Sequence, residues 1–447
     1  MSQSRQPTRV ILLGSTGSIG TQTVEVIEHL RRHGEPFEVV GLCAGGSNLG
    51  LLAEQAVRLG VPGHKVAIGR APAGGGGGST ELPAELRGAV CGAGAAEALV
   101  RETPCDVVVA AMVGASGLGA TLAAVELGRR VALANKETLV AAGGIIVPAA
   151  ERTGAVLLPV DSEHSAVWQC LQGRHGSAAA RAGSAGACVP PMRCDGEVRR
   201  VILTASGGAL RHLSAEAARR ATPAEALKHP TWSMGAKVTI DSASLTNKAF
   251  ELIEAHHLFG LEPERLAVVI HPQSLVHSMV EFADGSVMAQ ISPPDMRLPI
   301  QYALTFPARV EGIARRVDWL GLGGGNNPMA RMEFSVPEAG RYPALAAAER
   351  VMRVGGTSGA IFNGASEVAV EAFLAAGGVG GSRKSKTMRF GEMADVACAA
   401  LEGVPAGPAH SLADVLAADR AAREWARQWL ARAGFGEQVG VSSRAAR

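Results

Sequence analysis

The stretch Val10-Ile11-Leu12-Leu13-Gly14-Ser15-Thr16-Gly17-Ser18-Ile19-Gly20 decides the fold. Its four apolar residues predict a buried strand, its glycines a tight turn, and a helix is expected to begin near Thr21. Glycine lets the backbone approach a pyrophosphate, and the free N–H groups and dipole of a helix start attract one. Because the spacing is GxxGxxG rather than the usual GxGxxG, the turn predicts either a dinucleotide site or a strand-to-helix turn without a ligand.

Further apolar runs follow this turn and are continuous rather than alternating, as a parallel sheet buried on both faces requires. They are Val39–Cys43, Val107–Val113, Val131–Ala134 and Val156–Val160, with helix-like segments between them. We therefore expect the first part of the chain to be a doubly wound α/β domain. Its loop 71–80 contains five consecutive glycines and predicts a flexible surface insertion.

The segment after the second strand bears on the choice of dinucleotide. An NAD site would normally have an Asp or Glu there, which binds the ribose 2′-hydroxyl. The sequence has Ala44-Gly45-Gly46-Ser47-Asn48 instead, and small polar groups without an acid suit a 2′-phosphate. NADP(H) is therefore preferred over NAD(H), with helix capping by Ser47 or Asn48 as the alternative.

A second α/β region and a helical region are expected beyond residue 197. The expected strands are Val201–Leu203, Ala267–Ile270, Ser278–Phe282 and Ser286–Gln290, with a hairpin turn at Asp284-Gly285. Helical patterns occupy Tyr342–Val354, Ala365–Ala376 and Leu412–Ala433. The Ala-, Gly- and Ser-rich stretch 176–197 predicts disorder or a surface excursion, and the tail 442–447 is expected to fray.

Composition limits the class of protein. The chain has 447 residues, of which 47% are hydrophobic and 19% charged, so it can form two or three domains. A net charge of +2 from scattered basic residues argues against nucleic acid or an anionic membrane as a partner, and no apolar run reaches membrane-spanning length. Seven cysteines without paired metal-ligand spacing predict free thiols in a reducing cytoplasm.

Two polar tripeptides end strands of the predicted sheet. Asn135-Lys136-Glu137 follows one strand, and Asp161-Ser162-Glu163-His164 follows another. In an extended segment, Asp161 and Glu163 would point to the same side, which begins a hard-cation site, although two acids in a solvated turn are the alternative. Since ligands of open α/β sheets lie beyond the carboxyl ends of the strands, both tripeptides should face the crevice of the dinucleotide turn.

A third carboxylate is available in Asp241–Glu251. If this segment opens a helix, Asn247, Lys248 and Glu251 share one face, and the alternative is an ordinary surface Lys–Glu pair. Thr204–Gly208 offers hydroxyls and a flexible backbone for a phosphate. Lys228–Gly235 predicts a lid with an exposed Trp, or a passive loop that a buried Trp anchors.

Together these segments closely resemble the 1-deoxy-D-xylulose 5-phosphate reductoisomerase family. The resemblance extends over nearly the whole chain and includes the glycine turn, Leu133–Glu137, Asp161–His164, Thr204–Gly208, His229–Gly235, Asp241–Glu251, His271–Val280, Pro294–Arg297, Gly355–Thr357 and Glu367–Val370. It implies NADPH and Mg²⁺ or Mn²⁺ as cofactors, a phosphorylated sugar as substrate, no nucleic-acid or membrane partner, and a homodimer in the cytoplasm. The chemistry it implies is metal-assisted rearrangement of the carbon skeleton followed by hydride transfer from NADPH.

The resemblance also implies roles for individual residues. The NADPH contacts would be Thr16, Gly17, Ser18, Ile19, Gly46, Ser47, Asn48, Asn135, Glu137 and Gly235. The metal ligands would be Asp161, Glu163 and Glu251. The catalytic residues would be Lys136, Asp161, Glu163, His229 and Glu251. The substrate contacts would be Lys136, Ser162, Glu163, Ser206, His229, Trp232, Ser242, Asn247, Lys248 and Glu251, with Trp232 and Met234 closing over the substrate.

The implied architecture is α/β, with a Rossmann-like NADP-binding domain (1–160), a central α/β connective and catalytic domain (161–306), a linker (307–335) and a mainly α-helical C-terminal domain (336–447). The chain departs from the family pattern at Ala209-Leu210, Gly359 and Ser366, none of which is an expected metal or phosphate position. Two other functions need fewer of these residues. A metal-free NADP-dependent dehydrogenase, or a redox sensor that binds NADP(H) without catalysis, would need the glycine turn but not the carboxylates.

Overall fold

The computed structural model describes residues 6–70, 82–172, 188–194, 196–228, 232, 235–319, 332–376 and 387–435. The glycine-rich loop 71–80, residues 176–187 and the tail 442–447 lie outside the described residues, so their predictions stay predictions. Residues 188–194 contradict the expected disorder, and part of this segment packs against the core. Cys194 is buried, and the main-chain oxygen of Cys188 accepts a hydrogen bond of 2.7 Å from the Trp168 indole.

A seven-stranded parallel sheet forms the N-terminal part, in the order β4-β3-β2-β1-β5-β6-β7. Its strands are β1 (Thr8–Leu13), β2 (Phe37–Ala44), β3 (Val66–Ile68), β4 (Val90–Cys91), β5 (Val107–Ala110), β6 (Arg130–Leu133) and β7 (Val156–Pro159). The doubly wound domain is confirmed, but β3 and β4 were missed because their two or three residues make no recognisable apolar run. The strand order reverses between β1 and β5, which is where such sheets open a ligand crevice.

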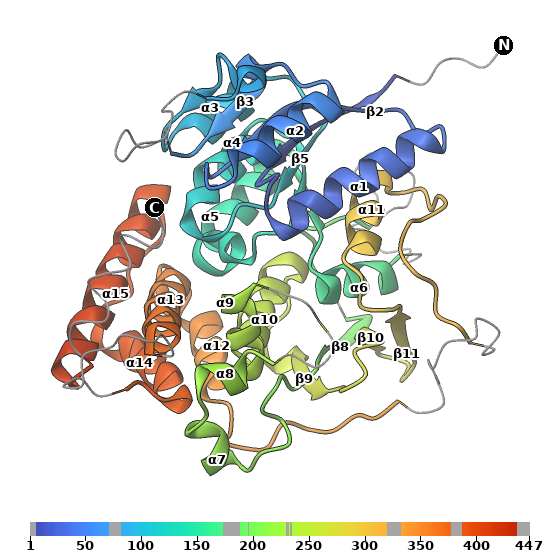
Figure 1. Cartoon of the computed structure of the whole chain (residues 1–447). Helices are drawn as coiled ribbons and strands as arrows, with labels where there is room; N and C mark the ends of the chain where they lie inside the picture. Colours follow the sequence, from blue (N-terminus) through green and yellow to red (C-terminus); the bar gives the residue numbers. More distant parts are fainter. Residues whose placement is uncertain are drawn as a thin grey trace.

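Helices flank this sheet (Figure 1). They are α1 (Ser18–Arg32), α2 (Leu49–Leu59), α3 (Ala95–Glu102), α4 (Leu118–Glu126) and α5 (Lys136–Thr153). Short 3₁₀ turns lie at η1 (Gly63–Lys65), η2 (Ala84–Leu86), η3 (Gly114–Gly117) and, in the next region, η5 (Pro263–Arg265).

A four-stranded sheet of order β11-β10-β8-β9 forms the central part. Its strands are β8 (Val198–Ala205), β9 (Leu266–Ile270), β10 (Val276–Phe282) and β11 (Val287–Ile291), and its helices are α6 (Ser162–Cys170), α7 (Ala215–Arg219), α8 (Pro223–Ala226), α9 (Ala236–Ala243), α10 (Thr246–Phe259) and α11 (Arg297–Thr305). The predicted hairpin is confirmed, since β10 and β11 pair antiparallel and Gly285 has a φ of +88°.

An aromatic cluster fixes α6 between the two sheets. Trp168 of α6 is fully buried, and its ring centroid lies 4.7 Å from that of Tyr302 and 4.5 Å from that of Phe306. Arg130 of β6 donates hydrogen bonds to the main-chain oxygens of Ala303 and Phe306. The C-terminal half of α6 is thereby held, through the end of α11, against the start of β6.

The C-terminal part consists of helices (Figure 1). They are α12 (Pro343–Val354), α13 (Ser358–Ala376), α14 (Phe390–Gly403) and α15 (Leu412–Arg432), of which α14 was not predicted. Gly359 has a packing role, because a Cβ there would clash with the Val140 carbonyl of α5. The end of the predicted linker is bound to the central sheet by a β-bridge between Ser335 and Ile270, and the domain limits themselves stay predictions. Among the described residues no helix is long and apolar enough to cross a bilayer.

Candidate active site

The glycine turn is built by close approach of main chains. Gly14 has a φ of +83°, and a Cβ there would clash with the Ala111 carbonyl just after β5. A Cβ on Gly20 would clash with the main-chain oxygens of Gly14 and Ser15. The helix begins at Ser18, three residues earlier than expected, and its N-cap Gly17 carries no side chain. The N–H groups of the first helical turn are therefore open to an anion, and the turn fits a pyrophosphate.

The segment after β2 combines a turn with a helix cap. Gly46 has a φ of +98°, and a Cβ there would lie 2.9 Å from the Arg70 carbonyl oxygen. The Asn48 side chain accepts a hydrogen bond of 3.1 Å from the N–H of Leu51 and caps α2. The capping alternative is therefore observed for Asn48. Because its side chain and that of Ser47 are exposed, the same residues are also accessible to a cofactor.

The end of β6 places the second group of expected cofactor residues. Asn135 caps α5 by accepting from the Thr138 N–H at 3.2 Å, and it donates to the Gly114 carbonyl at 3.1 Å and to that of Met112. The next residue, Lys136, reaches Asp161 at the end of β7, with 3.0 Å between Nζ and Oδ2. The segments that follow β6 and β7 therefore contact each other, and their place beside the glycine turn stays a prediction.

The local geometry of Asp161 and Glu163 differs from the prediction. Strand β7 ends at Pro159, Asp161 is the N-cap of α6, and Glu163 lies in the first turn of that helix. The two acids are therefore not i and i+2 neighbours on a strand. Ser278 of β10 holds this turn by donating a hydrogen bond of 2.9 Å to the Glu163 main-chain oxygen.

Asp161 and Glu163 nevertheless converge with Glu251 of α10. One carboxylate oxygen from each of the three residues lies within 4.8 Å of the other two. Three oxygen donors at this separation fit a hard divalent cation such as Mg²⁺ or Mn²⁺, provided that water or substrate completes the coordination. We call these three residues the outer carboxylate set.

Two lysines lie among these carboxylates, Lys248 buried and Lys136 half-buried. The Nζ of Lys248 lies 2.8 Å from Glu163 Oε1 and also bonds Glu251, whereas the Nζ of Lys136 lies 2.5 Å from Asn247 Oδ1 and 3.5 Å from Glu251 Oε1. Asn247, Lys248 and Glu251 all lie on α10, so their expected helix is confirmed. The alternative of a surface pair is wrong, since Lys248 and Glu251 are only 3% and 1% exposed.

Burial and charge move the carboxylate pKa values in opposite directions. Burial alone would raise the pKa of Asp161, but the charge of Lys136 outweighs it and holds the pKa below its usual range. Burial is likewise outweighed at Glu163, whose pKa is lowered by Lys248. Burial and the Glu163 charge raise the pKa of Glu251 to about 8. Full ionisation of the outer set near neutral pH therefore calls for more positive charge than the two lysines supply.

Main-chain packing brings together the residues that are expected to bind the substrate phosphate. Gly208 has a φ of +66°, and a Cβ there would lie 2.9 Å from the Ser242 main-chain oxygen of α9. The Gly208 N–H donates to Ser206 Oγ at 3.1 Å, so the Ser206 loop lies against α9.

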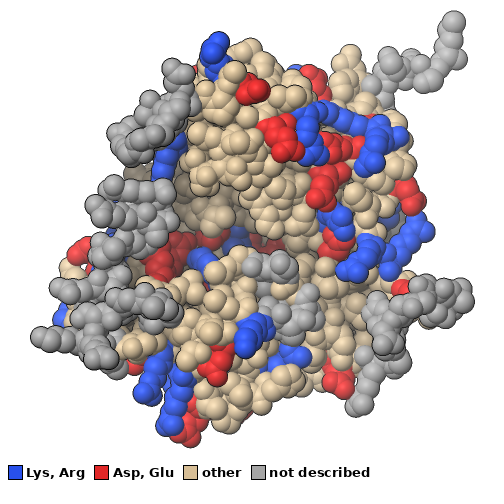
Figure 2. Space-filling model, in the orientation of Figure 1, with Lys and Arg blue, Asp and Glu red and all other residues tan. Residues whose placement is uncertain are grey.

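Figure 2 shows a recess between the upper part of the molecule and the rest, with acidic and basic side chains on its floor.

The predicted lid lies partly outside the described residues, since His229 and Met234 are not described. Trp232 is half-buried rather than exposed, and its ring centroid lies 6.2 Å from that of His277 on β10. Gly235 is the N-cap of α9. The lid function of this segment therefore stays a prediction.

The sequence analysis missed Lys237 and Glu254. Lys237 Nζ lies 3.0 Å from Asp241 Oδ2 and 3.6 Å from Glu137 Oε1, so it joins α9 to the start of α5. Glu254 is 3% exposed, and burial together with the Asp161 charge raises its pKa well above the usual range. Glu254 follows the expected ligand Glu251 at i,i+3, and this spacing was the available signal for it. Lys237 lies four residues before Asp241, which had no predicted role, so no comparable signal was available for Lys237.

Comparison with family models gives three matches. A model described as 1-deoxy-D-xylulose 5-phosphate reductoisomerase matches residues 10–143, a model of that enzyme's C-terminal domain matches residues 157–259, and a model described as DXP reductoisomerase C-terminal domain matches residues 291–425.

Individual relatives match over nearly their whole length. The 1-deoxy-D-xylulose 5-phosphate reductoisomerase of Pseudomonas putida is 41% identical over 96% of this chain and 98% of its own. That of Mycobacterium avium is 45% identical over 96% and 95%. The solved enzyme of Zymomonas mobilis in complex with NADPH is 37% identical over 95% of this chain and 99% of its own, with a TM-score of 0.78. A DOX-P reductoisomerase with NADPH, fosmidomycin and magnesium is 31% identical over 96% and 100%, with a TM-score of 0.77.

Proposed function

Because the chain belongs to the 1-deoxy-D-xylulose 5-phosphate reductoisomerase family, we propose a specific role for each part of its active site. The protein is an NADPH- and divalent-metal-dependent enzyme. It converts 1-deoxy-D-xylulose 5-phosphate to 2-C-methyl-D-erythritol 4-phosphate in the non-mevalonate route to isoprenoid precursors.

The outer carboxylate set is proposed to hold Mg²⁺ or Mn²⁺. Its support is the convergence of three carboxylate oxygens within 4.8 Å, which is the single observation that carries the assignment. When bound, the cation would polarise the substrate carbonyl and a neighbouring hydroxyl, and NADPH would supply the hydride. Lys248 contacts Glu163 and Glu251 in the structure, so a cation at these oxygens would compete with that ammonium group for them.

Lys136 is proposed to stabilise negative charge on the substrate oxygens. Burial would lower its pKa, but Asp161, Glu251 and Glu254 outweigh burial and raise the pKa well above the usual range. The ammonium group is therefore charged throughout the working pH range and is held by Asp161 and Asn247. A fixed positive charge in a buried site stabilises a developing oxyanion more strongly than the same charge in water.

The remaining substrate contacts are proposed by position. Ser206, Ser242, Asn247 and Lys248 would bind the phosphate, and Ser162 would contact the substrate from the start of α6. His229 and Trp232 would close over it. The support is the packing of the Ser206 loop against α9 and the location of Asn247 and Lys248 on the first turn of α10.

The NADPH site is proposed to combine three segments. The turn Thr16–Ile19 would bind the pyrophosphate, Gly46–Asn48 the 2′-phosphate, and Asn135 and Glu137 with Gly235 the nicotinamide end. The first two follow β1 and β2, which are neighbours in the sheet, and Lys237 links the third segment to α9.

One assay tests this function. We expect NADPH oxidation when 1-deoxy-D-xylulose 5-phosphate and Mn²⁺ are both present, loss of the reaction on full chelation, and recovery when the metal is restored. Turnover that survives chelation would favour a metal-free dehydrogenase. Absence of any NADPH oxidation, with NADPH binding intact, would favour a redox sensor.

A homodimer and a cytoplasmic location complete the proposal. Strand β11 is an edge of the central sheet, with Val287 53% and Met288 49% exposed, and an exposed apolar edge strand can pair with a second copy. Sedimentation should give twice the chain mass, and Met288→Lys should shift it toward the single chain. No disulfide joins any of the seven cysteines, all of which lie in the described residues, and this is consistent with a reducing compartment, which cell fractionation can check.

A further inference from the structure

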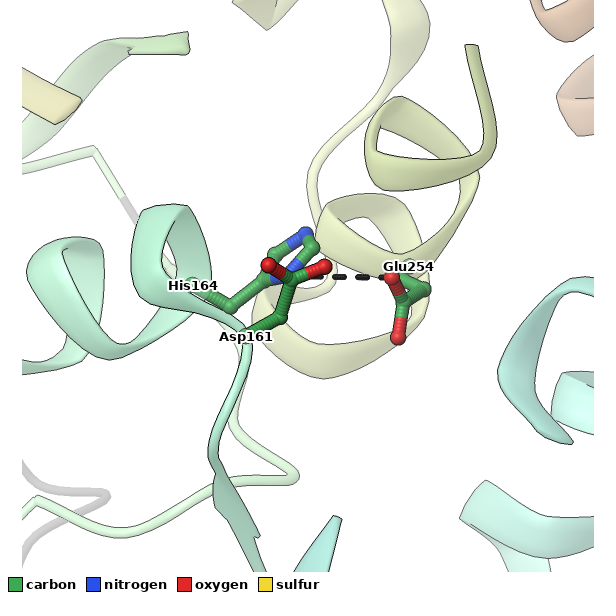
Figure 3. A group of neighbouring side chains, drawn as sticks. All are labelled: Asp161, His164 and Glu254. Carbon is green, nitrogen blue, oxygen red and sulfur yellow. Dashed lines mark ion pairs between the residues drawn. The ribbon is translucent and has the colours of Figure 1, made fainter. Parts of the chain in front are cut away.

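Asp161 also belongs to a second group of side chains, which lies deeper than the outer carboxylate set. Figure 3 shows Asp161 and His164, from the start of α6, pointing toward Glu254 on α10. His164 Nδ1 lies 3.9 Å from Asp161 Oδ2 and 3.8 Å from Glu254 Oε2. One ligand atom from each residue lies within 4.8 Å of the others, and we call these three residues the inner set.

The hydrogen bonds of His164 determine what its second nitrogen can do. His164 Nε2 lies 2.8 Å from the main-chain oxygen of Glu251, and because a carbonyl oxygen only accepts, Nε2 must carry the hydrogen. In the neutral ring, Nδ1 therefore carries a lone pair instead of a hydrogen, and this lone pair faces two carboxyl groups.

Two atoms of the inner set have no hydrogen-bond partner among the described residues: His164 Nδ1 and Glu254 Oε2. Their side chains are 1% and 3% exposed, so bulk water does not satisfy them. Two buried electron-pair donors without partners that converge with Asp161 require either a shared proton or a metal cation between them.

We propose that the inner set is a second divalent-cation site that takes a transition metal such as Zn²⁺ or Co²⁺. Imidazole nitrogen suits these ions, and one histidine with two carboxylates leaves a position for a fourth ligand. Mg²⁺ prefers oxygen ligands and keeps several waters, so a nearly dry site with a nitrogen ligand discriminates against it. The outer set, with three oxygens, has the opposite preference.

The two sites share Asp161, so they compete for its carboxylate. The ion pairs also limit their joint occupancy. When all four are ionised, the carboxylates Asp161, Glu163, Glu251 and Glu254 outnumber the ammonium groups Lys136 and Lys248 by two charges, which one divalent cation balances. A cation in the inner set should therefore weaken Mg²⁺ binding at the outer set.

Visible absorption of Co²⁺ tests the proposal without relying on activity, because four-coordinate Co²⁺ absorbs far more strongly than six-coordinate Co²⁺. Titration of the metal-free protein with Co²⁺ should produce strong bands that saturate at one equivalent. His164→Gln and Glu254→Gln should each abolish the bands and weaken Zn²⁺ binding, measured by chelator competition, at least about 10-fold. Glu251→Gln changes only the outer set and should keep the bands.

His256→Gln is the matched control, because His256 lies on the same helix as Glu254 but its ring nitrogen contacts the Leu261 main-chain oxygen. This variant should behave as the wild type. Absence of the strong bands from the wild-type protein would overturn the proposal and indicate that a shared proton occupies the space between the three groups. Bands that persist unchanged in both folded variants, His164→Gln and Glu254→Gln, would overturn it as well. NADPH oxidation with Mg²⁺ depends on the outer set. It is therefore retained if only the proposed inner site is wrong, and it is absent if the proposed function is wrong.

Discussion

The glycine turn and the outer carboxylate set both lie beyond the carboxyl ends of strands of the large sheet, yet they are built in different ways. The turn lies within one short segment, and its shape comes from main-chain packing around Gly14 and Gly20. The outer set joins α6 to α10, and Lys248 bonds Glu163 from 85 residues further along the chain. The turn is thus specified by sterics and the carboxylate set by charge balance.

This difference predicts how each region fails. A side-chain atom added in the turn displaces a neighbouring main chain, and the expected result is weaker binding of the cofactor. A lost charge in the carboxylate set leaves other buried charges without partners, and the cost appears in turnover and in its dependence on metal and pH.

The largest expected effect is that of Glu251→Gln. Removal of one metal ligand should lower kcat/KM about 10³-fold, because a bound cation contributes several kcal/mol to the transition state. NADPH affinity should not change, since Glu251 lies outside the glycine turn. Steady-state NADPH oxidation and fluorescence titration measure the two quantities. Glu262→Gln, an exposed acid just after the same helix, is the control, and near-normal turnover of Glu251→Gln would refute the metal assignment.

Gly14→Ala should have the next largest effect. The positive φ and the clash with Ala111 should cost about 1–3 kcal/mol, which corresponds to NADPH binding weaker by about 5–150-fold. Gly34→Ala is a matched control, because Gly34 has a similar φ of +85° but no atom within 4 Å of the added Cβ. Equal losses of NADPH affinity in the two variants would show that close approach at the turn is unimportant.

Asn48→Asp separates capping from cofactor binding at one residue. Aspartate also caps a helix and should leave the melting temperature unchanged or higher. A negative charge beside the 2′-phosphate should raise the KM for NADPH about 5-fold while leaving the KM for NADH unchanged. Equal KM values for NADPH in the variant and the wild type would limit Asn48 to its cap on α2.

The smallest expected effect is a pH dependence of the metal-free protein. Burial and Glu163 raise the pKa of Glu251 from about 4.5 to about 8, so its contribution to stability is complete below pH 4.5 and is lost as the pH rises toward 8. The melting temperature of the wild type minus that of Glu251→Gln should therefore fall by about 2 °C or more between pH 5 and 8 in chelator. Buried His164 and His277, whose pKa values burial lowers, contribute with the opposite sign to both proteins and cancel in this difference. A constant difference would contradict the charge-balance account.

Most of the fold could be predicted from apolar runs and turn residues. The five longer strands of the large sheet and the β10–β11 hairpin were predicted, because runs of four or more β-branched and apolar residues are a strong local signal. Strands β3 and β4 are too short to give one. Asp161 and Glu163 were assigned to a strand because their polar run follows β7 directly, whereas two residues after Pro159 the chain turns into α6.

The sequence by itself determined what local geometry controls. A turn of three glycines can approach a neighbouring main chain, and the spacing of Asn247, Lys248 and Glu251 places them on one helix face whatever surrounds that helix. Only the tertiary structure decided which face is buried and what it meets. The meeting of Glu251 with Asp161 and Glu163, and of Glu254 with His164, depends on the packing of α6 against α10, because residues so far apart in the chain have no fixed relative position until the core has formed.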